Sequence, residues 1–165
     1  MSDPKDELVF QEGGVEILDL IAPLWQQLNR HHQAISEHFG QAIAQMTFDM
    51  RRAGLVEKAM QGLLRVDLAK IETGMPVAYC VSTIDAQQTG EVDSIFVQPQ
   101  FRGQGIGDRL MRRALRWLDG QGAQSKIVVV AWGNEGVLTF YRRYGFFPRN
   151  LTLKQMPSVE PSAMN

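Results

Sequence analysis

Apolar residues in the first third of the chain recur with the period of a helix. Between residues 20 and 39 they return every three to four positions, which predicts one amphipathic helix. A second, less regular helical pattern covers residues 42–60, where Gly54 weakens it. Ahead of both, short apolar runs on either side of Gly13-Gly14 predict a first strand with a bulge or a tight turn.

The middle of the chain changes to the two-residue period of strands. Residues 63–72 alternate in this way. Turn signals at Thr73-Gly74 and at residues 87–90 separate them from predicted strands at 77–84 and 91–97. Strands joined by such short turns are expected to pair antiparallel.

The last third of the chain predicts helices and strands in alternation. Residues 105–119 form the clearest helix, with apolar side chains on one face and four arginines on the other. A continuous apolar run at 127–132 is typical of a strand buried on both faces. We expect a further helix from Gly133-Asn134 to Tyr144-Gly145 and a final strand at 146–153. Hairpins followed by strand–helix–strand units predict a mixed sheet of the α+β or α/β kind.

Length and charge narrow the functions that the chain can perform. We expect one domain over residues 1–165, with loose termini at 1–6 and about 157–165. A net charge of −1 argues against a protein that binds nucleic acid, which needs a basic face. We expect a cytoplasmic protein without membrane contact, because no leader opens the chain and no apolar run reaches the roughly 20 residues that span a bilayer. The single Cys80 lies in an apolar run and is expected to be a buried core thiol.

The most informative segment is a glycine-rich turn between a predicted strand and the clearest helix. Gly103, Gly105 and Gly107 stand at alternate positions, so several backbone N–H groups can point into one concavity. The following helix adds its unpaired first N–H groups and the positive end of its dipole. This combination predicts an anion site, usually for phosphate or pyrophosphate.

Two common phosphate-binding loops do not match this turn. A P-loop needs a Lys-Ser/Thr pair after its last glycine, where this chain has Asp108-Arg109. A dinucleotide-binding fold needs a third glycine, where this chain has Leu110. A nucleotide-binding α/β domain is therefore disfavoured.

Two motifs resemble those of the GNAT N-acetyltransferase superfamily. The spacing Arg102-x-x-Gly105-x-Gly107 resembles its coenzyme A loop, and Asn134 followed by Phe140-Tyr141 and a Gly-Phe pair resembles its second signature. The resemblance covers residues 91–147 closely, whereas residues 1–62 match only in the order of their elements. It implies a splayed, predominantly antiparallel sheet flanked by helices. It also implies an N-acetyltransferase that passes an acetyl group directly from acetyl-coenzyme A to a primary amine of a small molecule or a protein.

The resemblance also implies roles for individual residues. The Tyr141 hydroxyl would act as general acid beside the sulfur, and Asn134 would contact the pantetheine arm. The expected cofactor-binding residues, besides Asn134 and Tyr141, lie on the strand and the turn: Ile95, Phe96, Val97, Arg102, Gly103, Gln104, Gly105, Ile106, Gly107 and Asp108.

The general base is less clearly indicated. Glu91 and Asp93 share one side of a predicted strand, and either carboxylate, or water, could take the proton of the amine. In the family that the chain resembles, the first helical region covers the acceptor pocket, which implies acceptor binding through His31, His32 and Glu37; a solvated helix face is the alternative. These residues and His38 show no recognisable metal-ligand spacing, so no metal is expected.

A second interpretation of the same motifs is a protein that binds coenzyme A without catalysing a reaction. A coenzyme A-binding sensor or assembly subunit without catalysis would use the same cofactor loop, although it has no use for Tyr141 as a proton donor. For the enzyme the expected partner is an amine acceptor on a small molecule or a protein, and a homodimer is one arrangement of the chain.

Overall fold

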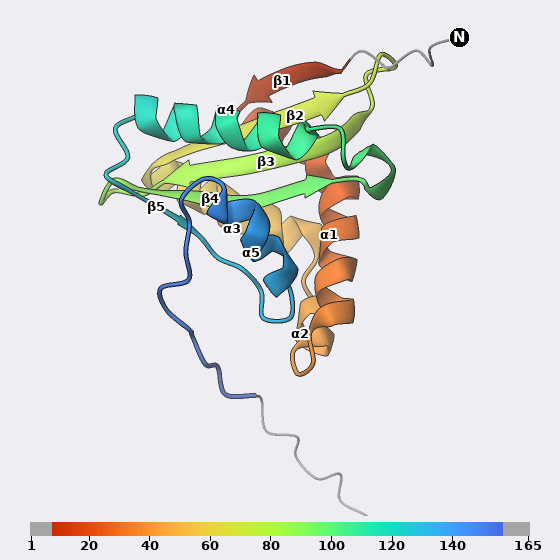
Figure 1. The fold of residues 1–165 in the computed structure, drawn as a ribbon, viewed down its shortest axis with the longest axis vertical. Helices are drawn as coiled ribbons and strands as arrows, with labels where there is room; N and C mark the ends of the chain where they lie inside the picture. Colours follow the sequence, from red (N-terminus) through yellow and green to blue (C-terminus); the bar gives the residue numbers. More distant parts are fainter. Residues whose placement is uncertain (1–7, 157–165) are drawn as a thin grey trace, which may run out of the picture.

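The computed structural model describes residues 8–156 as a five-stranded sheet with helices on both faces (Figure 1). The predicted loose termini lie outside these residues. The strands are β1 (Val9–Gly13), β2 (Leu63–Lys70), β3 (Pro76–Ile84), β4 (Thr89–Val97) and β5 (Ser125–Val128). The α-helices are α1 (Ala22–Ile35), α2 (Gly40–Ala44), α3 (Phe48–Gln61), α4 (Ile106–Gly120) and α5 (Leu138–Arg142). Three 3-10 segments are η1 (Val15–Ile21), η2 (Pro99–Phe101) and η3 (Glu135–Val137).

The strands follow one another across the sheet in the order β1-β2-β3-β4-β5. β2, β3 and β4 pair antiparallel because short turns connect them, and β1 pairs antiparallel with β2 after the helices α1 to α3. β5 pairs parallel to β4 after the α4 crossover. The predicted mixed, mainly antiparallel sheet flanked by helices is therefore confirmed.

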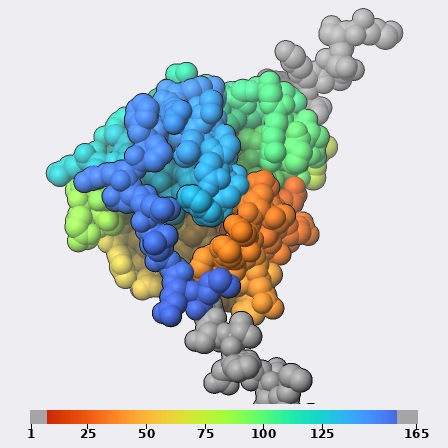
Figure 2. Space-filling model, turned by 60° about the horizontal axis from the view of Figure 1, so that its bottom comes forward, coloured from red at the N-terminus to blue at the C-terminus, as the bar shows by residue number. Residues whose placement is uncertain are grey.

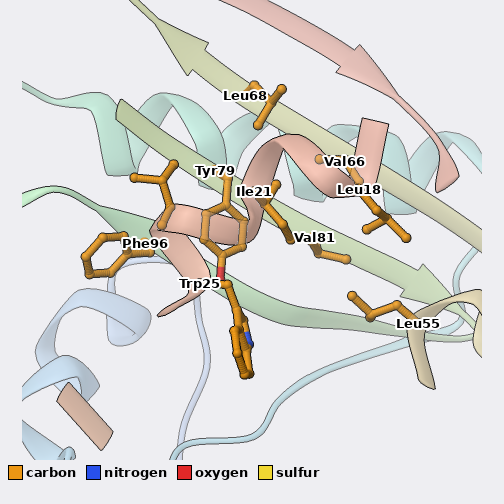
Figure 3. Close-up of a cluster of buried hydrophobic side chains, with 10 residues drawn as sticks. Leu18, Ile21, Trp25, Leu55, Val66, Leu68, Tyr79, Val81 and Phe96 are labelled. Atoms are coloured by element: carbon orange, nitrogen blue, oxygen red, sulfur yellow. The ribbon is translucent and has the colours of Figure 1, made fainter. Parts of the chain in front are cut away.

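Two hydrophobic clusters lie on opposite faces of the sheet. Tyr79 and Val81 of β3 join side chains of η1, α1 and α3 in the first cluster (Figure 3). Ala78 and Cys80 point the other way and pack with α4 in the second cluster. Successive strand residues face opposite sides, so β3 supplies both clusters and is buried along nearly its whole length. Cys80 is a buried free thiol, as predicted.

Two predictions for the N-terminal region were wrong in detail. The run after Gly14 forms η1 instead of continuing the first strand. Its buried residues Leu18 and Ile21 are three positions apart, which fits one face of a 3-10 helix. The helical pattern at 42–60 divides into α2 and α3 because Thr47 starts a new helix, accepting a hydrogen bond from the Met50 N–H over 3.2 Å.

The C-terminal strands also differ from the prediction. The run at 127–132 pairs only as far as Val128, and Val129 is 74% exposed, so it is not buried on both faces. No strand forms at 146–153, and within residues 8–156 the segment 147–156 makes no main-chain hydrogen bond. A strand needs a neighbour that exchanges main-chain hydrogen bonds with it. β5 loses β4 beyond Val128, and residues 147–156 pair with no strand of the described chain.

The predicted helix after the glycine turn is confirmed as α4. Its apolar face is buried against the sheet, with only Leu115 of the predicted stripe partly exposed. Within the described part of the chain, no helix combines the length and the apolar character needed to cross a membrane.

Candidate active site

A cavity of about 830 Å³ opens where β4 and β5 separate. The two strands pair only up to Val92 and Val128. Beyond that point β4 and the chain after β5 diverge, and their facing sides line the cavity with the glycine turn, α1 and α5. Figure 2 looks onto the face where α1, in orange, meets the C-terminal part of the chain, in blue.

A β-bulge at Asp93 marks the place of separation. Val81 of β3 pairs with Ser94, but the next residue of β3, Ser82, pairs with Val92, so Asp93 is an extra residue in β4. A bulge bends its strand and increases the local twist. The bend turns β4 away from β5 and so opens the cleft.

The bulge is held by charged side chains of α3. The Asp93 side chain is only 2% exposed. Lys58 Nζ donates to its Oδ1 over 2.6 Å, Thr83 Oγ1 donates to its Oδ2 over 2.5 Å, and Arg51 Nη2 lies 3.6 Å from Oδ1. Burial opposes the charge of Lys58, but hydrogen bonds to Asp93 and Glu91 outweigh burial and raise its pKa. The carboxylate of Asp93 therefore has a partner on each oxygen.

Glu91 also forms an ion pair with Lys58, but it does not line the cavity. Lys58 Nζ donates to Glu91 Oε2 over 2.8 Å, and Glu91 is absent from the cavity wall. Of the two carboxylates predicted as bases, the structure brings only Asp93 to the wall. The sequence gives no signal of the pairing with Lys58, which lies 33 residues before Glu91.

Two glycines of the turn have the left-handed backbone conformation. Gly103 and Gly105 both have φ +77, and no atom lies within 4 Å of where a Cβ would stand at either position. Gly105 precedes the first turn of α4 in this left-handed conformation. Arg102 Nε donates to the Val97 carbonyl over 2.9 Å, which ties the turn to the end of β4.

The side chain of Asp108 has structural partners. Its carboxylate accepts hydrogen bonds from the Tyr144 hydroxyl and, over 2.8 Å, from Arg112 Nε. The hydrogen bond from Tyr144, followed by that from Arg112, lowers the pKa of Asp108. Asp108 thus joins the start of α4 to the turn after α5 and keeps its negative charge.

The C-terminal half of α1 borders the cavity opposite the sheet. His31 Nε2 lies 3.2 Å from Asn134 Oδ1, so α1 contacts the loop before η3. Gly133 has φ +96, and a Cβ there would lie 2.4 Å from the Ile35 carbonyl oxygen, so only glycine permits this approach. His32 is half-buried, and burial followed by the charge of His31 lowers its pKa.

Tyr141 lines the cavity from α5. Its ring packs edge-on against Phe140, with centroids 5.3 Å apart, and against Phe146 at 6.3 Å. Burial, with a smaller contribution from Cys80, raises the pKa of Tyr141 to about 12. The hydroxyl is therefore protonated at neutral pH and available as a donor.

Most of the predicted site residues meet at this cavity. The exceptions are Glu91, Gln104 and Glu37; Gln104 is exposed, and Glu37 is exposed beside His38. Wall residues that the sequence did not reveal include Leu28, Ser94, Arg143 and residues 128–131, whose apolar run indicated only a core strand. Among the described residues, the hydroxyls of Tyr79 and Ser94 are buried without a hydrogen-bond partner. Residues 8–156 contain no group of three His, Cys, Asp or Glu side chains arranged to hold a metal ion.

Residues 25–146 match the model of the family described as Acetyltransferase (GNAT) family. An uncharacterized N-acetyltransferase of Methanocaldococcus jannaschii is 34% identical over an alignment of 79 residues that covers 44% of this chain. The match spans only 35% of that archaeal protein.

Solved structures resemble the fold over most of its length. A GCN5-related N-acetyltransferase from Ralstonia eutropha JMP134 superposes with a TM-score of 0.71 at 20% identity, covering 90% of this chain and 98% of that one. An aminoglycoside N-acetyltransferase in complex with coenzyme A gives 0.68 at 16% identity, covering 95% and 99%. At these identities the likeness concerns the fold.

Proposed function

Because the chain belongs to the acetyltransferase (GNAT) family, we propose that it is an enzyme that transfers an acetyl group from acetyl-coenzyme A to a primary amine. The observation that carries this proposal is the cleft between β4 and β5. Its wall holds the glycine turn at one place and Tyr141 at another. Acetyl-coenzyme A supplies the thioester whose acetyl group is transferred.

The residues at the cleft fit such a cofactor. Gly103 and Gly105 leave open space above a backbone whose N–H groups can bind a pyrophosphate. Arg102 and Arg143 bring positive charge to the same wall.

Tyr141 is proposed as the proton donor to the leaving thiolate. Its hydroxyl is protonated at neutral pH and lines the cavity, so it can donate a hydrogen bond, and a proton as negative charge develops, to the departing sulfur. Asn134 is proposed to orient the pantetheine arm. Its side-chain amide keeps its donor group free, because its oxygen faces His31.

His32 is proposed as the proton acceptor for the amine. Asp93 has ion-pair or hydrogen-bond partners on both oxygens, and Glu91 stands off the wall, so neither carboxylate presents a free oxygen to an amine there. His32 lines the cavity, and its lowered pKa keeps the imidazole neutral at pH 7. That Glu91 or Asp93 acts as the base stays a prediction. Rate measurements on variants of His32, Glu91 and Asp93 over a range of pH distinguish the three residues.

The acceptor is proposed to be a small amine or an exposed protein amine that enters beside α1. The test is thiol release from acetyl-coenzyme A across a panel of polyamines, aminoglycosides and peptides with a free N-terminus, together with calorimetry of coenzyme A binding. We expect binding and amine-dependent thiol release. Binding without release on any amine would support the sensor or assembly subunit, and absence of both would refute the proposal.

A further inference from the structure

Two acidic side chains line the cavity, and each is already paired with a cation. Asp93 Oδ1 lies 2.6 Å from Lys58 Nζ and 3.6 Å from Arg51 Nη2. The Asp108 carboxylate accepts a hydrogen bond from Arg112 Nε over 2.8 Å. Among the described residues, no other carboxylate lies on this wall. The wall that these residues form therefore offers a bound molecule no negative charge that is not already balanced.

The arginines of the cavity wall bring positive charge. Arg102 and Arg143 both line it. Arg102 Nε donates to a main-chain carbonyl, and the Arg143 guanidinium lies 4.9 Å from the centroid of the Phe140 ring, so neither of these contacts neutralises the arginine. The other titratable bases on the wall, His31 and His32, bring no negative charge either. Positive charge thus exceeds negative charge on the wall that the described residues form.

Apolar side chains line the part of the cavity where the acceptor is proposed to enter. Leu28 belongs to α1, and Val129 and Ala131 belong to the chain after β5. These two segments meet where His31 of α1 lies 3.2 Å from Asn134. An amine that enters beside α1 therefore meets an apolar surface and two histidines.

A second positive charge on the acceptor is poorly accommodated at such a wall. An ammonium group that leaves water loses hydration, and a protein site compensates for that loss with a carboxylate or another hydrogen-bond acceptor. The reacting nitrogen avoids this cost, because it must be neutral when it attacks a carbonyl. A second ammonium group does not avoid it, and it is also repelled by Arg102 and Arg143. The wall therefore discriminates by the number of positive charges on the acceptor.

We propose that the acceptor is a single amine on an uncharged, apolar body, and that the charge of this wall excludes amines with a second positive charge. The inference rests on the proposed acetyl transfer and narrows its acceptor. In that reaction the amine nitrogen bonds to the acetyl carbon as the carbon–sulfur bond breaks. The nitrogen loses one proton, and coenzyme A leaves as the thiol. The product is a neutral amide, which suits the apolar side of the cavity as the amine does.

Two amines of equal length, 1-aminohexane and 1,6-diaminohexane, test the proposal within the wider amine panel. Thiol release from acetyl-coenzyme A gives kcat/KM for each amine at one pH. We expect kcat/KM per amino group to be at least about fivefold higher for 1-aminohexane, and the difference to shrink in high salt. An equal or higher value for the diamine, or a polycation as the best acceptor of the panel, would overturn this inference and leave acetyl transfer standing. Thiol release with no amine at all would overturn both.

A carboxylate added to the wall should reverse the preference. Val129 lines the cavity and is 74% exposed, so Val129→Asp should fold and should raise kcat/KM for the diamine about fivefold relative to the monoamine. Ala34→Asp is the matched control, because it adds the same charge to α1 at an exposed position off the wall. Calorimetry of coenzyme A binding checks that both variants keep the cofactor site. If Val129→Asp leaves the ratio unchanged, or if Ala34→Asp changes it equally, the charge of the wall does not select the acceptor.

Discussion

The ammonium group of Lys58 lies 2.6 Å from Oδ1 of Asp93, so an ion pair joins α3 to the bulge of β4. The same ammonium group lies 2.8 Å from Glu91 Oε2. Two carboxylates that the sequence assigned to proton transfer are thus joined by one cation. Their arrangement supports the bend that separates β4 from β5.

Replacing Lys58 with Met should destabilise the fold by about 1–3 kcal/mol. Removing one partner of a fully buried ion pair costs roughly 3–5 kcal/mol. The loss is smaller here because Lys58 is 42% exposed and Arg51 remains beside Asp93. Urea unfolding measures it. Arg52→Met, which breaks an exposed pair with Asp19, is the control and should cost about 1 kcal/mol or less.

A second substitution checks the cause. Adding Asp93→Asn to Lys58→Met removes the buried negative charge and should recover part of the lost stability. If the double variant is less stable than Lys58→Met by the full effect of Asp93→Asn alone, the two side chains are not coupled.

Proton transfer to His32 predicts an acid-sensitive rate. The lowered pKa of His32 places its protonation below the ordinary value of 6.5, so kcat/KM should fall only below that pH. In His32→Gln this acidic limb should disappear and the rate should drop by roughly 10²–10⁴. His38→Gln is the control, because His38 is exposed and off the wall. An acidic limb that survives in His32→Gln but is lost in Glu91→Gln or Asp93→Asn would make a carboxylate the base.

The same lowered pKa predicts a pH dependence of stability. The unfolded chain takes up a proton at its His32 near pH 6.5, whereas the folded chain does so at a lower pH. This contribution to stability is complete above pH 6.5 and is lost as the pH falls from there through the folded-state pKa. Unfolding of His32→Gln should therefore respond less to acid than unfolding of the natural chain, as urea melts at a series of pH values would reveal.

Tyr141→Phe should separate catalysis from packing. The ring remains, so the free energy of unfolding should change by no more than about 1 kcal/mol. Turnover should fall by roughly 10²–10⁴ if the hydroxyl protonates the thiolate, while affinity for acetyl-coenzyme A hardly changes. Turnover and melting temperature are measured on one preparation. Normal turnover with a lower melting temperature would mean that Tyr141 stabilises the fold by packing and does not donate the proton.

Gly105→Asp should abolish coenzyme A binding, because it places a side chain and a negative charge above the turn. Gly74→Asp is a closely matched control. Gly74 has φ +82 and open space around its would-be Cβ, as Gly105 does, but it lies in the turn between β2 and β3. Calorimetry on both folded variants compares them. Equal affinities of Gly105→Asp and Gly74→Asp for coenzyme A would show that the glycine turn is not part of the binding site.

The sequence by itself determined the elements whose causes are local. The glycine turn and α4 could be predicted because positive φ at Gly103 and Gly105 and the apolar stripe of α4 depend only on neighbouring residues. The alternation along residues 63–97 likewise determined the antiparallel hairpins. Cofactor-loop residues and Tyr141 could be named for the same reason, since their motifs are contiguous, and the structure places most of them on one cavity wall, while their roles stay predictions.

Tertiary structure decided what depends on a distant partner. His31 meets Asn134 across 103 residues, and Lys58 meets Asp93 across 35, so no local pattern signals either contact. Strand patterns at 127–132 and 146–153 indicate side chains that suit a sheet. They do not supply the neighbour whose main chain must accept and donate the hydrogen bonds, and in residues 8–156 that neighbour exists only for β5 as far as Val128.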